Sequence, residues 1–73
     1  MKYRVRHINN VEPEDYITEF KTEEEAERFI EKGLNSFKEE NKDYEYDYGV
    51  FGNTTEFWVC DDVEYATWER MWL

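Results

Sequence analysis

Hydrophobic and polar residues alternate in two short stretches near the start of the chain, residues 3–8 and 15–20. A period of two is typical of strands that bury one face. Turn-forming residues separate the two stretches, so the pattern predicts a hairpin with a long connection. The outer face of the first stretch carries Arg4 and Arg6, which together with Lys2 make the only basic patch of the sequence.

Residues 22–41 have the pattern of an amphipathic helix. Apolar side chains recur three or four residues apart from Ala26 to Phe37, which gives one continuous stripe. Thr22 and Glu25 have the spacing of a capping box, in which the threonine hydroxyl accepts from the backbone N–H three residues later. Gly33 interrupts the stripe, and we expect it to admit the close approach of a strand or an aromatic ring.

A second hairpin is predicted over residues 44–51 and 54–61, joined by the two-residue loop Gly52-Asn53. This loop places Asp47 opposite Trp58 in the register. One face, expected to lie under the helix, then carries Tyr44, Tyr46, Tyr48, Val50, Phe57 and Val59. The other face carries Glu45, Asp47, Phe51, Glu56, Trp58 and Cys60.

The segment 61–73 fits two structures. Tyr65, Trp68 and Trp72 have helical spacing, and Asp61 or Asp62 is suited to cap a short helix. The same segment alternates as a fifth strand would, and of the two we favour the helix. The chain is therefore expected to be a single α+β domain, residues 1–73, in which a small antiparallel sheet in the order ββαββ is packed on one face by one long helix.

Composition adds a strongly negative surface to this fold. The chain has 19 acidic and nine basic residues, a net charge of −10, together with three Trp, six Tyr and five Phe. Such a surface favours cationic partners and disfavours direct binding to nucleic acid or anionic lipid. The N-terminus has no apolar run typical of a signal peptide, so we expect a cytoplasmic location.

Residues suited to chemistry are few. His7 and Cys60 are the only histidine and the only cysteine, which leaves no ligand set for a transition metal and no framework for an internal disulfide. Asp61, Asp62 and Glu64 lack the spacing of a calcium loop. We therefore expect no enzymatic activity, cofactor or metal.

The acidic surface itself is the remaining candidate site. We expect it to dock on a basic nucleic-acid-binding surface of a partner protein and block it, in the manner of a nucleic-acid mimic or a phage-type inhibitor of a CRISPR effector, nuclease or polymerase. The expected contact residues are Glu24, Glu27, Glu31, Glu45, Asp47, Glu56 and Trp58. Lys2, Arg4 and Arg6 are expected to pair with Glu45 and Asp47.

An alternative role is self-association. In this hypothesis an apolar patch is buried across a homodimer, and the acidity serves only solubility. The patch would consist of Phe51, Trp58, Trp68 and Trp72.

Overall fold

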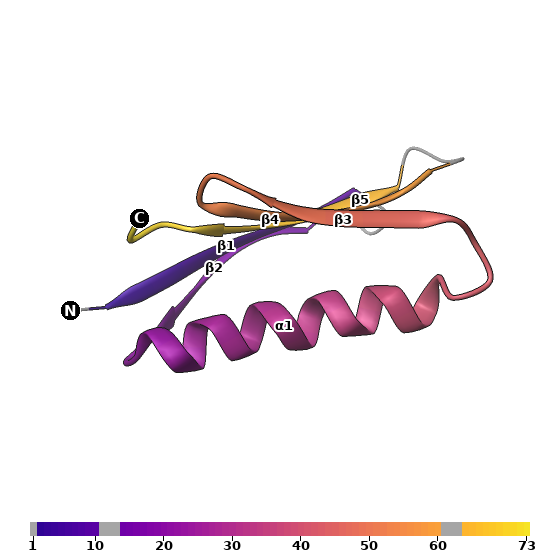
Figure 1. Cartoon of the computed structure of the whole chain (residues 1–73). Coiled ribbons are helices and arrows are strands. Elements are labelled where there is room, and N and C mark those ends of the chain that lie inside the picture. The colour runs from indigo at the N-terminus through magenta and orange to yellow at the C-terminus, as the bar shows by residue number, and fades with distance from the viewer. Residues whose placement is uncertain (1, 11–13, 61–63) are drawn as a thin grey trace.

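A computed structural model describes residues 2–10, 14–60 and 64–73, which form a five-stranded antiparallel sheet with one helix on one of its faces (Figure 1). The elements are β1 (Tyr3–Asn9), β2 (Glu14–Phe20), α1 (Glu23–Glu40), β3 (Tyr46–Phe51), β4 (Thr54–Val59) and β5 (Tyr65–Arg70). The strand order across the sheet is β2-β1-β5-β4-β3. The predicted α+β class and the ββαββ order of the first five elements are confirmed.

The favoured helix in the C-terminal segment is wrong, and the alternative, a fifth strand, is correct. β5 lies at the centre of the sheet, where Trp68 pairs with His7 of β1 and with Thr55 of β4. Each of the two hairpins has an inner edge with unpaired backbone groups, and one strand between them satisfies both edges. The expected cap at Asp61 or Asp62 lies outside the described residues.

Both predicted hairpins are confirmed. In the β3–β4 hairpin Asp47 faces Trp58, as the two-residue loop required. Gly52 has a φ of 62°, the left-handed conformation that glycine adopts at the first position of a type II′ turn. In the β1–β2 hairpin His7 faces Tyr16, and the connection between these strands includes residues 11–13, which lie outside the described part of the chain.

The helix begins and ends close to the predicted positions. The Thr22 hydroxyl accepts a hydrogen bond from the backbone N–H of Glu25 at 3.2 Å, which caps the N-terminus as predicted. At the other end, the Asn41 side-chain amide donates to the Phe37 carbonyl at 2.9 Å. These contacts satisfy backbone groups that a helix end otherwise leaves open to water.

The core lies between α1 and the sheet, and Trp68 is its largest fully buried side chain. Its indole packs against the helix at Gly33, where an added Cβ would lie 2.9 Å from the ring. This is the close ring approach that the mid-helix glycine predicted. The buried core residues are Val5, Ala26, Ile30, Phe57, Val59, Ala66 and Trp68.

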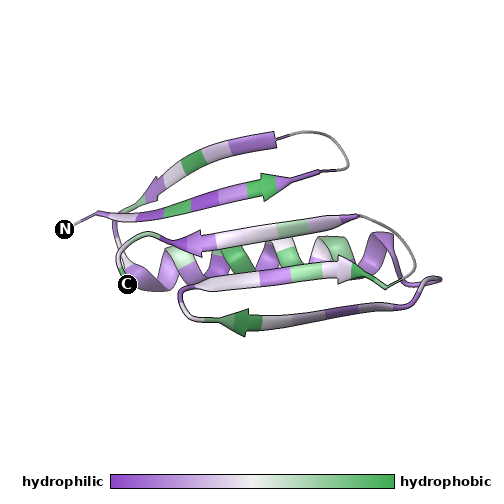
Figure 2. Ribbon diagram, turned by 90° about the horizontal axis from the view of Figure 1, so that it is seen from above, coloured by the Kyte–Doolittle hydropathy of each residue, from purple (hydrophilic) through white to green (hydrophobic). Residues whose placement is uncertain are grey.

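The outer strand of the second hairpin is less covered than the sequence pattern predicted. Tyr44, Tyr48 and Val50 belong to the face assigned to the core, yet they are 66, 47 and 64 % exposed. The reason is visible in Figure 2, where α1 runs behind the middle of the sheet and β3 lies beyond it as the outermost strand. Lys38 reaches over Tyr48, with its Nζ 3.7 Å from the ring centroid.

Candidate partner-binding surface

The residues predicted to contact a partner fall on opposite sides of the molecule. Asp47 faces Trp58 across the β3–β4 pair, and Glu56 lies two residues from Trp58, so these three side chains share the sheet face that α1 does not cover. Glu45 immediately precedes β3 and continues the same alternation, since its carbonyl accepts from the Cys60 N–H at 2.8 Å. Glu24, Glu27 and Glu31 belong to α1, on the other side of the sheet (Figure 1).

Glu27 is paired within the molecule, which corrects the expectation that its carboxylate is free to contact a partner. Its two carboxylate oxygens accept from the Arg70 guanidinium at 2.6 and 2.8 Å. A third guanidinium contact goes to the Thr55 hydroxyl at 2.9 Å. Glu27 therefore joins the helix to β4 and β5, and the sequence carried no signal of this because the partners are 43 residues apart.

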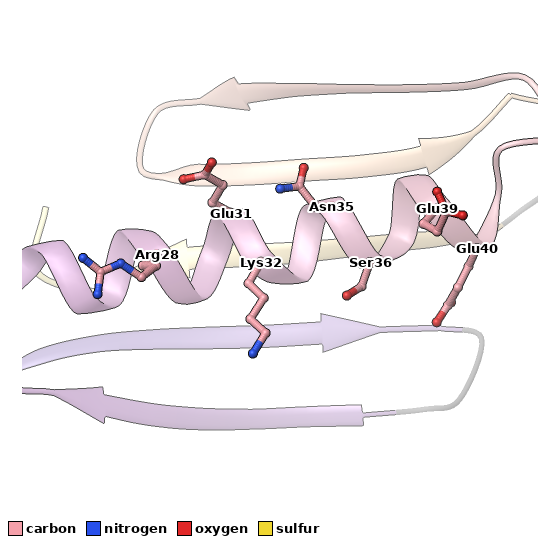
Figure 3. A pocket seen from close by; sticks show the side chains of 7 residues that line it. All are labelled: Arg28, Glu31, Lys32, Asn35, Ser36, Glu39 and Glu40. Carbon is pink, nitrogen blue, oxygen red and sulfur yellow. The ribbon is translucent and has the colours of Figure 1, made fainter.

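The outer face of the helix is a solvated surface of mixed charge. Glu24 accepts a hydrogen bond from Arg28 one turn later at 2.7 Å. The shallow pocket on this face (Figure 3) is lined by Arg28, Glu31, Lys32, Asn35, Ser36, Glu39 and Glu40. Because positive and negative side chains are interspersed along it, this face of the helix attracts a cationic partner less strongly than the negative part of the sheet does.

On the open face of the sheet, the β1–β2 half is neutralised by its own ion pairs. Arg6 donates two hydrogen bonds to Asp15, at 2.9 and 2.7 Å, and these bonds lower the pKa of Asp15. Arg4 donates to Glu19 at 2.8 Å and Lys2 lies 3.4 Å from the same carboxylate; both lower the pKa of Glu19.

The expected pairing of Lys2, Arg4 and Arg6 with Glu45 and Asp47 is therefore wrong. The reason is topological, since β5 and β4 lie between β1 and β3. The cations meet the acids of β2 instead, and the acids of the second hairpin are left without them.

The β3–β4 half of the open face is negative and uncompensated. Residues 43–69 contain eight acidic residues and no Lys or Arg. Within the described ranges, none of the acids in 43–60 forms an ion pair. We call this region the acidic-aromatic surface, and it consists of Glu45, Asp47, Phe51, Glu56 and Trp58.

Aromatic rings lie among these carboxylates. Phe51 is 56 % exposed and its ring centroid is 6.3 Å from that of Trp58, which is half-buried. Tyr65 is the cross-strand neighbour of Trp58 and extends the ring surface onto β5. Trp58 was predicted from the sequence as a contact residue but Phe51 was not, although the loop register already places both on the same face.

The apolar patch required for self-association does not form as expected. Trp68 is fully buried, and Trp72 packs edge-on against Tyr3 with centroids 5.3 Å apart. Only Phe51 and Trp58 of the four remain together on the surface, between carboxylates.

His7 and Cys60 lie in different environments. His7 is buried in β1, where its ring stacks on Trp68 with centroids 4.9 Å apart and its Nδ1–H donates to the Thr67 carbonyl at 3.1 Å. Burial lowers the pKa of His7 from its usual 6.5, against the smaller opposing effects of Thr67 and of Glu14, whose Oε2 is 4.0 Å from Nε2. Cys60 is exposed at the end of β4 and makes no disulfide.

The free energy of unfolding is expected to fall as the pH drops from 7.5 to 5.5. Because the pKa of His7 is lower in the folded protein, its stabilising contribution is complete above about 6.5 and is lost as the pH falls towards the folded value. Asp15 and Glu19, whose ordinary pKa values are 3.8 and 4.5, are lowered and titrate below this window. Urea unfolding at three pH values measures the free energy of unfolding of the wild type and of His7→Phe. The same loss of stability with falling pH in both proteins would contradict the prediction.

No further chemical site emerges in the part of the chain that the structure describes. Residues 2–10, 14–60 and 64–73 contain no group of three or more His, Cys, Asp or Glu side chains that could hold a metal ion, and Asp61 and Asp62 of the predicted carboxylate cluster lie outside these ranges. The same ranges contain no helix long and apolar enough to cross a membrane. Comparison with protein-family models, curated proteins and solved structures finds no match.

Proposed function

We propose that this protein binds a basic, nucleic-acid-binding surface of a partner protein through its acidic-aromatic surface and thereby excludes nucleic acid. The supporting observation is that the sequence from residue 43 to residue 69 is acidic and contains no Lys or Arg, and that its described carboxylates Glu45, Asp47 and Glu56 share a sheet face with the partly exposed rings of Phe51 and Trp58. The role is inhibitory binding, with no catalytic step.

The carboxylates of the acidic-aromatic surface attract a cationic partner because no Lys or Arg among the described residues pairs with them. A carboxylate already paired with Arg gains little from a second cation, as on the β1–β2 half of the sheet. Glu45, Asp47 and Glu56 have no such partner among the described residues, so Lys and Arg that normally hold phosphates can pair with them. This attraction accelerates encounter and weakens with salt.

The aromatic rings supply the second part of the interaction. Trp58 and Phe51 lie between the carboxylates, and aromatic side chains at the centre of an interface contribute more binding energy than rim charges. The guanidinium group of Arg can both stack on such a ring and donate hydrogen bonds to a neighbouring carboxylate. A surface with both carboxylates and exposed rings therefore favours a cleft rich in Arg over one whose positive charge comes mainly from Lys.

Reversing three charges on the open face is expected to weaken binding at least tenfold. The test measures displacement of a fluorescent oligonucleotide from a nuclease, a polymerase and a CRISPR effector by the wild type and by the variant Glu45→Lys, Asp47→Lys, Glu56→Lys. Each added lysine would meet the cations of the partner at short range, and like charges in contact oppose association.

The matched control reverses two carboxylates on the far side, Glu24→Lys and Glu31→Lys. Its effect should be much smaller, because charges beyond a Debye length of about 8 Å at physiological salt are largely screened. Equal losses for the two variants, or displacement that does not weaken with added salt, would contradict the proposed surface.

A further inference from the structure

The outer edge of β3 presents backbone groups that are not paired with another strand within residues 2–10, 14–60 and 64–73. β3 is the last strand of the sheet, and in an antiparallel pair successive residues point their N–H and C=O alternately towards and away from the neighbouring strand. The Glu45 carbonyl accepts from Cys60, so Glu45 points towards β4. It follows that Tyr46, Tyr48 and Val50 point their backbone groups away from the sheet.

This edge is only weakly protected. Natural edge strands avoid pairing with other chains by carrying lysine, proline or a bulge. β3 has none of these, and its ladder to β4 is regular from residue 46 to residue 51. The protection consists of Asp47, whose Oδ1 accepts from the Tyr48 N–H at 2.8 Å.

The charge of the edge indicates what would pair with it. At the opposite edge, β2 carries Asp15 and Glu19, and both are neutralised by arginines of β1. Glu45, which precedes β3, and Asp47 within β3 have no such neutralisation among the residues described. A second copy of this chain would bring the same net charge of −10 to the edge, whereas a basic segment would remove the repulsion.

We propose that β3 takes up an extended Lys- and Arg-containing segment of a partner protein as a sixth, antiparallel strand. The inference rests on the proposed function and specifies how the partner is held. Backbone hydrogen bonds to Tyr46, Tyr48 and Val50 supply the pairing, and side-chain positions supply the specificity. As the strand adds, the Tyr48 N–H exchanges Asp47 for a carbonyl of the segment, and Asp47 pairs with a cation.

The register assigns different side chains to alternate positions of the segment. Residues opposite Asp47 and Gly49 lie on the open face, where cations meet the uncompensated carboxylates. Residues opposite Tyr46, Tyr48 and Val50 lie on the helix face, where the Lys38 ammonium disfavours a second cation and exposed apolar surface favours an aliphatic residue. The favoured segment therefore alternates basic and apolar residues.

The test uses synthetic peptides of nine residues and fluorescence anisotropy with the whole protein. A peptide of alternating Lys and Val should bind at least tenfold more tightly than a peptide of the same composition with its lysines in one block. N-methylation of the valines, which face the β3 edge in this register, should weaken binding about tenfold because backbone hydrogen bonds are lost. N-methylation of the lysines, whose N–H groups face away, should leave the affinity unchanged.

The outcomes separate this inference from the proposed function. Equal, salt-dependent binding of all four peptides would overturn strand addition and leave electrostatic docking intact. Failure of every peptide to bind, together with failure to displace nucleic acid from any basic protein, would overturn both.

A variant of the protein tests the same edge from the other side. Val50→Pro removes an N–H that points away from β4, and proline is tolerated at such edge positions. Val50→Pro should weaken binding of the alternating peptide about tenfold, while Val50→Thr should leave that binding unchanged. If sedimentation instead shows a wild-type dimer that Val50→Pro dissociates, the occupant of the edge is a second copy and the proposal is wrong.

Discussion

Trp68→Ala is expected to abolish the cooperative unfolding transition of this protein. Trp68 is 1 % exposed, stacks on His7 and meets Phe37 edge-on with centroids 5.6 Å apart. Replacing a fully buried Trp by Ala costs about 3–5 kcal/mol, because the transfer energy is lost and a cavity remains. A domain of this size has a total stability of about 3–5 kcal/mol, so the folded state would no longer predominate.

The measurement is urea unfolding followed by circular dichroism, with Trp58→Ala as the matched control. Trp58 is half-buried on the open face and contacts Phe51 rather than the core, so the control should keep a two-state transition. A variant at Trp68 that unfolds cooperatively with nearly the wild-type midpoint would show that the core does not depend on this ring.

The second large effect is expected for Glu27→Ala, at about 2–3 kcal/mol. The Arg70 side chain is only 11 % exposed and is held by both oxygens of Glu27. Removing one partner of a buried ion pair leaves an uncompensated charge, which costs about 3–5 kcal/mol when both partners are buried. The expected loss is smaller here because the Glu27 side chain is 40 % exposed and water can partly replace it.

Glu24→Ala is the control for helix charge and composition. Glu24 pairs with Arg28 on the exposed face of the same helix, and such pairs contribute about 0.3–0.5 kcal/mol. The double change Glu27→Leu, Arg70→Leu should recover part of the loss, since no buried charge then remains unpaired. Similar losses in the free energy of unfolding for Glu24→Ala and Glu27→Ala, measured by chemical denaturation, would contradict the stabilising role of the Glu27–Arg70 ion pair.

Local elements were predictable because their signals are contained within a few neighbouring residues. The capping contact of Thr22 with Glu25 and the register set by Gly52-Asn53 depend on short stretches of chain and not on the rest of the fold. The mid-helix Gly33 predicted a close approach, although not which ring would make it. In each case the residue pattern and the backbone geometry together allow only one local conformation.

The candidate surface was predictable only in part. The alternation of the second hairpin placed Glu45, Asp47, Glu56 and Trp58 on one face, and the structure keeps that face open. The helix glutamates were assigned to the same site because all are acidic, but charge along a sequence carries no information about which side of a sheet a helix covers. Glu27 was misjudged for a related reason, since its partner is distant in the chain.

The sequence by itself determined an acidic, aromatic-rich composition, the α+β class, two hairpins and the approximate bounds of the helix, because hydrophobic periodicity, helix caps and turns act over a few residues. Only the tertiary structure decided that residues 65–70 form the central strand, since two hairpin edges had to be satisfied at once. That insertion separates Arg4 and Arg6 from Asp47, and it leaves one half of the open face negative. Long-range pairing thus decided where the charge remains uncompensated.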